Sequence, residues 1–463
     1  MILRFVLIYV CVLCSSFHVV ASNDQIDSLL NSLQQAPAKE RPATFLHISE
    51  AYRFSDLPLC IMYGDSAALL SDELGEVAQQ AKILKSLGVS CYYNGELDMA
   101  LDYYNESLDA FRAVNDLSGI ARCLNNIGLV YEEFGNYELS IDYYERSGEI
   151  GEQIDDQEWV AFVMHNLGNS YFYRGNMRLA INNYYRALII YKEMDDKNSI
   201  GDAYLNIGTV YNEWGEQEKA MEYFEQAREI YLAMGDERNL SKVLSNMAEM
   251  YNFEHKDYIK AKQLYEQSLE LKIRMNDLIG IAMQNHNLGT LYANMEEYEK
   301  AQKYFKISEN LYLEMESKTG LVMVYHHMGI LQQQQSNTAE AIRYFKKSLQ
   351  IADVIGQADY VSDNHEALFK CYASFGDYNN FYKHYKMFEI GNDTLLENLQ
   401  QAQMAEMEAR FKVDQIVKQN IALTEENQVV ASNARKYRML TFSFGGIIIF
   451  SLLFYFLYII FRR

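Results

Sequence analysis

Small and aromatic side chains recur along the chain with a period of about 40 residues. A short apolar motif closes on a small residue seven times, in steps of 40, 40, 40, 40, 41 and 40 residues, at Gly88, Gly128, Gly168, Gly208, Ala248, Gly289 and Gly329. A second small residue follows in each unit, with an aromatic ring four positions later, at Tyr104, Tyr144, Tyr184, Phe224, Tyr265, Phe305 and Phe345. The pattern predicts pairs of antiparallel helices, because small residues let two backbones approach and rings fill the gap to the next unit.

The turn and cap residues share this period. Glycine separates the two helices of a unit, where it ends a helix in the left-handed conformation at little cost, at Gly95, Gly135, Gly175 and Gly215. Aspartate stands between units, where a cap contributes ~1 kcal/mol, at Asp116, Asp156, Asp196, Asp236 and Asp277. The single step of 41 is explained by one extra residue in the loop 253–257. An eighth unit ends near Tyr378, and a degenerate unit overlies residues 40–75.

The motif His165-Asn166-Leu167-Gly168, followed by Tyr171, Gly175, Ala180, Tyr184 and Ala187, resembles the tetratricopeptide repeat. The resemblance extends over eight units, roughly residues 76–390. The usual period is ~34 residues, and a proline usually follows the second helix. This chain has a longer period and lacks that proline, as do the long repeats of kinesin light chains and polarity adaptors. The resemblance implies an all-α fold, a tetratricopeptide-type α-solenoid superhelix whose first helices line the concave face.

Composition supports a helical fold and excludes one class of partner. The three prolines, Pro37, Pro42 and Pro58, all lie near the N-terminus, which favours continuous helices afterwards. The net charge of −22 argues against nucleic acid, because a phosphate backbone requires a basic face. Four cysteines fall on helix positions where small or apolar side chains pack. We therefore expect buried free thiols at Cys60, Cys91, Cys123 and Cys371.

The two ends of the chain predict export and membrane attachment. Residues 1–21 have the positive start, apolar core and small-residue cleavage site of a signal peptide, with cleavage expected after Ala21. At the other end, Leu440–Phe461 contains 22 uncharged residues, enough to cross the hydrocarbon core as a helix. Charged residues just before this span weakly favour the opposite orientation. Because a signal peptide commits the N-terminus to export, we expect a single-pass inner-membrane protein with its repeats in the periplasm.

Between the repeats and this span, apolar residues follow a heptad pattern. The first seam position is occupied every seven residues, at Leu395, Ala402, Ala409, Ile416, Leu423, Val430 and Tyr437. The pattern predicts a coiled coil that forms a parallel homodimer through residues 395–437, with Asn420 and Asn427 fixing the register. A single amphipathic helix folded back on the repeats is the alternative. The expected organisation is therefore signal peptide 1–21, N-terminal region 22–75, repeat array 76–392, coiled-coil stalk 393–438, one transmembrane helix 439–461 and cytoplasmic tail 462–463.

One asparagine per unit is the main candidate for ligand binding. The resemblance implies that asparagines two residues before the small residue form a ladder for the backbone of an extended peptide, at Asn126, Asn166, Asn206, Asn246 and Asn287. An amide donates and accepts at once, which suits sequence-tolerant peptide recognition. Asparagine is also part of the general repeat pattern, so these amides alternatively bond within the array. Lys82, Arg122 and Lys242 lie close by in sequence and are candidates to receive a carboxylate.

Catalysis is not expected from this chain. His286 and His326 occupy equivalent positions in neighbouring units, too far apart to bind zinc without further ligands. We find no phosphate loop, nucleophile–base pair or cofactor motif, so we expect neither enzyme activity nor a cofactor. The first hypothesis is a membrane-anchored scaffold that binds a peptide or protein in its concave groove. The alternatives are the sensor subunit of an envelope signalling system with a separately encoded or lost output, and a cytosolic tail-anchored adaptor.

Overall fold

The structure is a computed structural model that describes residues 23–391. Within this range every regular element is a helix. Most helices are 17 residues long, and their bounds are α1 (Asn23–Gln35), α2 (Arg41–Tyr52), α3 (Leu57–Glu73), α4 (Val77–Tyr93), α5 (Leu97–Ala113), α6 (Leu117–Glu133), α7 (Tyr137–Gln153), α8 (Gln157–Tyr173), α9 (Met177–Glu193), α10 (Lys197–Glu213), α11 (Gln217–Met234), α12 (Glu237–Phe253), α13 (Tyr258–Arg274), α14 (Leu278–Asn294), α15 (Tyr298–Glu314), α16 (Lys318–Gln334), α17 (Thr338–Ile355) and α18 (Ala358–Phe375). Helical residues continue over 378–391.

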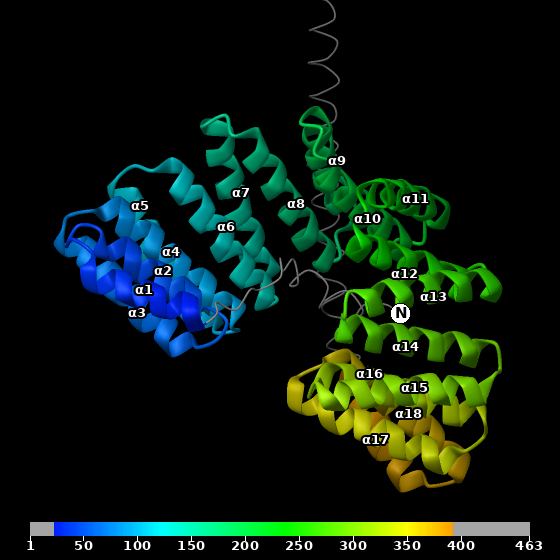
Figure 1. Cartoon of the computed structure of the whole chain (residues 1–463). Helices are drawn as coiled ribbons and strands as arrows, with labels where there is room; N and C mark the ends of the chain where they lie inside the picture. Colours follow the sequence, from blue (N-terminus) through cyan, green and yellow to red (C-terminus); the bar gives the residue numbers. More distant parts are fainter. Residues whose placement is uncertain (1–22, 392–463) are drawn as a thin grey trace, which may run out of the picture. The chain divides into compact units, whose positions relative to one another are not determined.

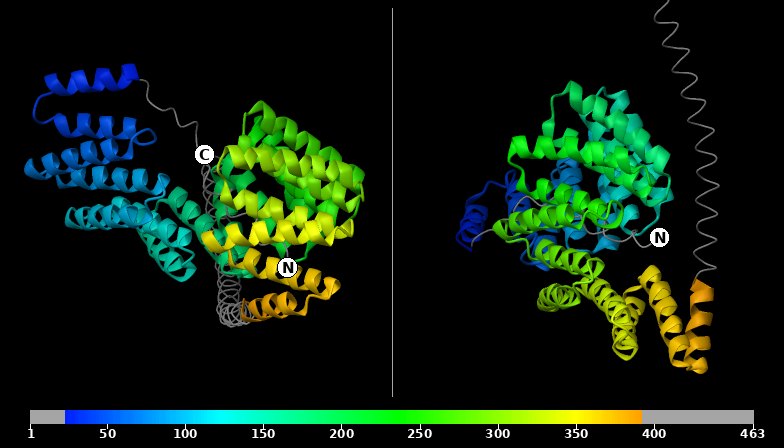
Figure 2. Two further views of the ribbon diagram at one scale, coloured as in Figure 1. Left: turned by 90° about the horizontal axis from the view of Figure 1, so that it is seen from below. Right: turned by 90° about the vertical axis from the view of Figure 1, so that its right-hand side faces the viewer.

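The helices form consecutive hairpins that stack in sequence order (Figure 1). The two helices of each hairpin pack most closely, in the pairs α2–α3, α4–α5, α6–α7, α8–α9, α10–α11, α12–α13, α14–α15 and α16–α17. The second helix of each hairpin then packs on the first helix of the next, and two further views follow the same succession (Figure 2). The all-α repeat fold predicted from the 40-residue period is confirmed. The degenerate unit corresponds to the α2–α3 hairpin.

In the six units whose small residue is glycine, this residue lies under the ring of the same hairpin. A Cβ atom added to Gly168 would lie 2.5 Å from the ring of Tyr184, and one added to Gly289 would lie 2.6 Å from Phe305. The helices therefore approach too closely for any side chain at these positions. The predicted role of the small residues is confirmed, whereas the rings cover their own hairpin crossing and do not only fill the gap to the next unit. The aromatic side chain and the glycine act as one packing pair.

The turns confirm the predicted cap chemistry. Gly95, Gly135, Gly175 and Gly215 have positive φ angles between 71° and 86°. The side chains of the five predicted aspartates each accept a hydrogen bond from the backbone N–H three residues on, at Asp116, Asp156, Asp196, Asp236 and Asp277. Each of these aspartates follows a residue of positive φ, so the turns between units pair a left-handed residue with an N-cap. All four cysteines in the described part of the chain are free and buried, as predicted.

The predicted leader 1–21, stalk 393–438, transmembrane helix 439–461 and tail 462–463 lie outside the described residues. Between residues 23 and 391, no helix is long and apolar enough to cross a membrane.

Candidate functional site

A groove with a cavity volume of about 450 Å³ runs along the first helices of successive hairpins. Residues from α4, α6, α8, α10, α12 and α14 line it, and second helices contribute only Tyr191, Phe224 and Lys272. The first helices line the groove because the second helices are packed behind them, between one hairpin and the next. The groove therefore follows the first helices, as the resemblance to the repeat family implied.

Four of the five predicted asparagines line this groove: Asn166, Asn206, Asn246 and Asn287. They occupy equivalent positions in four consecutive units, so they follow one another along the groove. Asn126 does not line it. The repeat register thus brings four of the candidate amides into one site and leaves the fifth outside.

Three of the four asparagines have side-chain hydrogen bonds, and that of Asn287 Oδ1 is to Nδ1 of the adjacent His286 at 3.3 Å. Asn166 Nδ2 donates to Asn125 Oδ1 of the preceding unit at 3.0 Å. Asn206 Nδ2 is 2.8 Å from His165 Nε2, again in the preceding unit. These two amides tie neighbouring first helices together, which is the alternative role considered from sequence. Asn246 has no side-chain hydrogen bond with any described residue, so both its carbonyl oxygen and its NH2 group are available to a ligand.

The three predicted basic residues are not equivalent in the structure. Lys242 lines the groove, whereas Lys82 and Arg122 are exposed and do not line it. The Arg122 guanidinium stacks 4.6 Å from the centre of the Trp159 ring, an arrangement that uses its charge within the array. Only Lys242 is placed to receive an anionic group in the groove.

Carboxylates at one edge of the groove were not singled out from sequence. Glu132 lies at the end of α6 and its Oε2 atom accepts a hydrogen bond from Ser170 Oγ at 2.5 Å and from Tyr144 OH at 3.5 Å. Burial raises the pKa of Glu132 to about 7, against the stabilising effect of these two donors. This carboxyl is therefore close to half-protonated near neutral pH.

Glu249 on α12 is a second carboxyl of this kind. Burial raises its pKa to about 7, and the negative charge of Glu213 on α10 adds to this shift. No hydrogen-bond donor among the described residues reaches the Glu249 carboxylate. Together with Glu133 and Asp202, these side chains give the groove an acidic character along α6, α10 and α12. A cationic group of a ligand would relieve the mutual repulsion of Glu213 and Glu249.

Sequence reasoning missed the acidic residues because they do not recur at one register position. Glu132 stands four residues after Gly128, Glu213 stands five after Gly208, and Glu249 stands one after Ala248. A repeat search finds what the units share, whereas these residues are where units differ. Lys272 is also absent from the sequence-based candidates, although a signal for it exists in its departure from the aromatic pattern.

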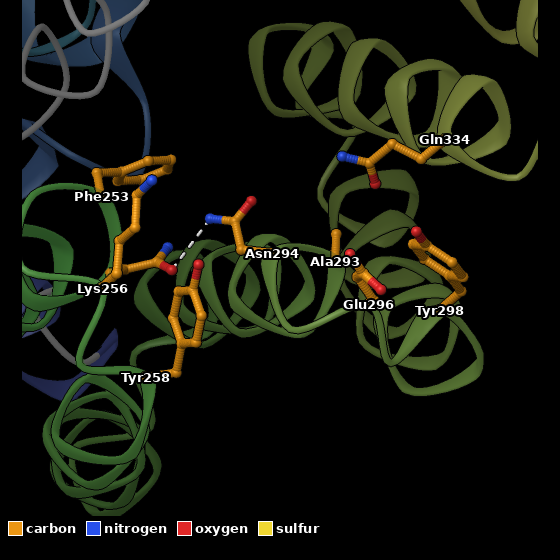
Figure 3. A pocket seen from close by; sticks show the side chains of 9 residues that line it. Phe253, Lys256, Tyr258, Ala293, Asn294, Glu296, Tyr298 and Gln334 are labelled. Atoms are coloured by element: carbon orange, nitrogen blue, oxygen red, sulfur yellow. Dashed lines mark hydrogen bonds between the residues drawn. The ribbon is translucent and has the colours of Figure 1, made fainter.

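A second hollow of about 430 Å³ lies at the turns that follow α12 and α14, near the end of α16 (Figure 3). Asn294 Nδ2 donates to Asn252 Oδ1 at 3.0 Å across it, and Lys256 and Gln334 border it. None of the predicted site residues takes part. Within the described residues, no three histidine, cysteine, aspartate or glutamate side chains gather at a distance suited to a metal ion.

Comparison with known families and structures agrees with this fold. A model of the tetratricopeptide repeat family matches residues 65–153, 159–233 and 281–353, together about half of the chain. No curated protein matches the chain.

Among solved structures, the apo quorum sensor NprR from B. thuringiensis is similar, with a TM-score of 0.53 and 15% identity over 80% of this chain and 97% of that one. A Rap protein complexed with competence and sporulation factor has a TM-score of 0.50 and 14% identity over 81% of this chain and 98% of that one. A signal transduction ATPase with a tetratricopeptide repeat sensor, from Pyrococcus horikoshii, has a TM-score of 0.51 and 15% identity, covering 75% of this chain and 56% of that one. At these identities the likeness concerns the fold.

Proposed function

Because the chain belongs to the tetratricopeptide repeat family, we propose that its groove binds an extended peptide or a protein segment. The observation that carries this proposal is the succession of Asn166, Asn206, Asn246 and Asn287 along one groove. Amide side chains at regular spacing can bond the backbone of an extended chain irrespective of its sequence. A volume of about 450 Å³ falls in the range of ordinary ligand clefts and suits a short peptide.

The charges of the groove support a ligand with both charged and apolar parts. Lys242 and Lys272 offer positive charge, while Glu132, Glu213 and Glu249 offer negative charge. Aromatic and aliphatic side chains, such as Phe162, complete the lining. Binding without catalysis is part of the proposal, since the amide, carboxylate and ammonium groups of the groove suit recognition of a peptide.

We further propose that this binding array is held outside the cytoplasm by a membrane anchor. The support comes from the sequence of residues 1–21 and 439–461, and the heptads of residues 395–437 support a homodimer. Mass spectrometry of the mature N-terminus tests the placement. A chain that begins near residue 22 is expected, whereas a chain that still begins at Met1 favours the cytosolic tail-anchored alternative.

Asn246→Ala tests the groove most directly, with Asn126→Ala as its matched control. Both replace an asparagine at the same position of a unit, but only Asn246 lines the groove. Loss of one or two hydrogen bonds to a bound peptide should weaken binding about 3- to 10-fold. Binding of fluorescent pentapeptide mixtures to the full chain is measured by anisotropy. Equal binding by both variants and the unsubstituted chain would show that the amides serve the array alone.

A sensor subunit remains the second candidate function. The fold is shared with proteins described as a quorum sensor and as an ATPase with a repeat sensor, and the order leader, array, stalk and span suits transfer of a signal across a membrane. Cross-linking of the full chain in its own membranes distinguishes the candidates. A cytoplasmic kinase, cyclase or regulator cross-linked to the tail favours a sensor, and partners confined to the repeats favour a scaffold.

A further inference from the structure

Three consecutive turns within the hairpins have side chains where the other turns have glycine. The left-handed residue between the two helices of a unit is glycine in five turns, at Gly95, Gly135, Gly175, Gly215 and Gly376. In the units between, it is Lys256, Glu296 and Ser336, with φ angles of 52°, 60° and 61°. A side chain in this conformation costs free energy that glycine avoids. These turns therefore retain their side chains against a local preference for glycine.

Two of these side chains border the second hollow, whose volume is about 430 Å³ (Figure 3). Lys256 and Glu296 line it from the turns after α12 and α14, and Gln334 lines it from the end of α16. The turn that contains Lys256 is also the one with the additional residue. The departures from the repeat pattern are therefore gathered at one place. Because backbone strain is retained most often at functional sites, the hollow is a candidate binding site.

An amide stands at the centre of this hollow. Figure 3 shows Asn294 between Lys256 and Tyr258 on one side and Glu296 and Tyr298 on the other. Asn294 Nδ2 donates to Asn252 Oδ1 at 3.0 Å, which fixes the orientation of the Asn294 amide. The Oδ1 atom of Asn294 accepts no hydrogen bond from another described residue. It is therefore available to a donor of a ligand.

The partner amide is also incompletely bonded. Asn252 lines the hollow and is 1% exposed. Its side chain affects the nearby Tyr265 phenol, but no acceptor lies at hydrogen-bond distance and angle from Asn252 Nδ2. A buried N–H group without an acceptor is costly. An acceptor atom of a ligand in the hollow would supply the missing bond.

The other polar groups of the hollow are free, and their charges balance. Five side chains that line it have no hydrogen bond or ion pair with another described residue: Lys256, Tyr258, Glu296, Tyr298 and Gln334. One is cationic, one is anionic, and the phenols and the amide both donate and accept. The lining thus mixes donors with acceptors and has no net charge, which disfavours a ligand of either sign.

We propose that this hollow binds a sugar. A sugar hydroxyl donates and accepts at once, so it matches a lining of amides, phenols, one ammonium and one carboxylate. The C–H groups of a sugar ring can pack on the half-buried rings of Tyr258 and Tyr298. An apolar ligand would leave the polar side chains without partners. The volume lies in the range of small-molecule clefts, and no lining residue is shared with the groove of the first helices.

Four sugars are the probes: D-glucose, D-galactose, D-mannose and N-acetyl-D-glucosamine. Tetrahydropyran-2-methanol, which has the same ring with a single hydroxyl, is the control compound. Binding to the full chain, purified in a detergent without a sugar headgroup, is measured by saturation-transfer difference NMR. At least one sugar should receive saturation from the protein, and the control compound should not. Saturation of none of the four sugars, or of the control equally, would overturn the proposal.

Glu296→Gly tests the location of the site, and Glu316→Gly is its matched control. Both residues are exposed glutamates with a left-handed backbone, but only Glu296 lines the hollow. Both variants should be at least as stable as the unsubstituted chain in thermal unfolding, because glycine relieves the strain. Only Glu296→Gly should weaken binding of the sugar, about fivefold or more. Equal affinity of the two variants for the sugar would contradict this site.

The methyl glycoside of the sugar that binds distinguishes two sources of the ligand. Binding of the reducing sugar alone identifies a free sugar, and equal binding of the glycoside identifies a sugar unit linked to a glycan. Pentapeptide mixtures should bind Glu296→Gly and the unsubstituted chain equally, because the two sites share no residue. Retained peptide binding without binding of any of the four sugars would overturn the sugar site alone and leave the groove unaffected.

Discussion

At the scale of single residues, glycine stands beneath the ring at six hairpin crossings, and Ala248 takes this place in the α12–α13 hairpin. Gly289→Ala would place a Cβ atom 2.6 Å from the buried ring of Phe305. Helix propensity alone favours alanine by ~1 kcal/mol, but displacing a packed ring costs more. We expect a net loss of about 1–3 kcal/mol, measured by denaturant unfolding.

Gly148→Ala is the matched control for this substitution. Gly148 is also inside a helix, and an added Cβ atom would meet only Val163 at 3.4 Å, an ordinary contact. This variant should be unchanged or stabilised by up to ~1 kcal/mol, because only helix propensity acts. Equal effects of the two variants would mean that the ring at Phe305 yields easily and that glycine is not required at the crossing.

The caps between units provide a second residue-scale prediction. Asp156 Oδ1 accepts a hydrogen bond from Trp159 N at 3.0 Å, so Asp156→Ala should lower the free energy of unfolding by ~1 kcal/mol. Glu96→Ala is the comparison, because the Glu96 side chain stands at the N-cap of α5 without a capping hydrogen bond. Thermal unfolding followed by circular dichroism measures both. A loss as large for Glu96→Ala would show that charge near the helix start matters more than the hydrogen bond.

At the scale of helices, histidines make the last hairpins sensitive to acid. His286 on α14 and His327 on α16 meet edge to face at 4.5 Å between ring centres, and His326 lies beside them. Burial lowers the pKa of all three, that of His327 to about 4. A lowered pKa in the folded state means that the neutral form is favoured, so the stability they contribute is full above ~6.5 and is lost as pH falls toward 4.

Hydrogen exchange at pH 7 and pH 5 tests this sensitivity. Protection of α14 and α16 should fall at pH 5, while α5 and α11, which contain no histidine, should retain theirs. His327→Gln should reduce the difference, because glutamine cannot be protonated in this range. A uniform loss of protection along the array would assign the pH effect to carboxylates or to net charge instead.

At the scale of the whole molecule, the sequence predicts the repeated features and not the individual ones. The helix pairs, their turns and their caps follow from positions such as Gly168 and Asp156, because the same local contacts recur in every unit. Whether an asparagine of the groove also bonds its neighbour depends on the adjacent unit: Asn166 meets Asn125 and Asn206 meets His165, whereas Asn246 meets no such partner. These are contacts between residues about 40 positions apart, which one unit's sequence does not contain.

Binding of a peptide in the groove should stabilise a defined part of the array. In a repeat protein each unit contacts only its neighbours, so stabilisation by a ligand spreads from the units it touches and decays beyond them. The predicted ligand amides lie on α8, α10, α12 and α14. A peptide selected from the mixtures, at 100 times its Kd, should stabilise these units by up to ~2.7 kcal/mol.

Hydrogen exchange measured with and without that peptide shows which helices the peptide protects. Slower exchange is expected along α8, α10, α12 and α14, with a smaller effect on the helices packed behind them. The α2–α3 hairpin has no residue in the groove and should exchange at an unchanged rate. Equal protection of α2–α3 would mean that the array responds as one cooperative body, and protection confined to α9, α11 and α13 would place the ligand on the opposite face. The first result would contradict the local spread of stabilisation. The second would contradict a peptide bound along the asparagines, because the first helices would then not be the surface that it contacts.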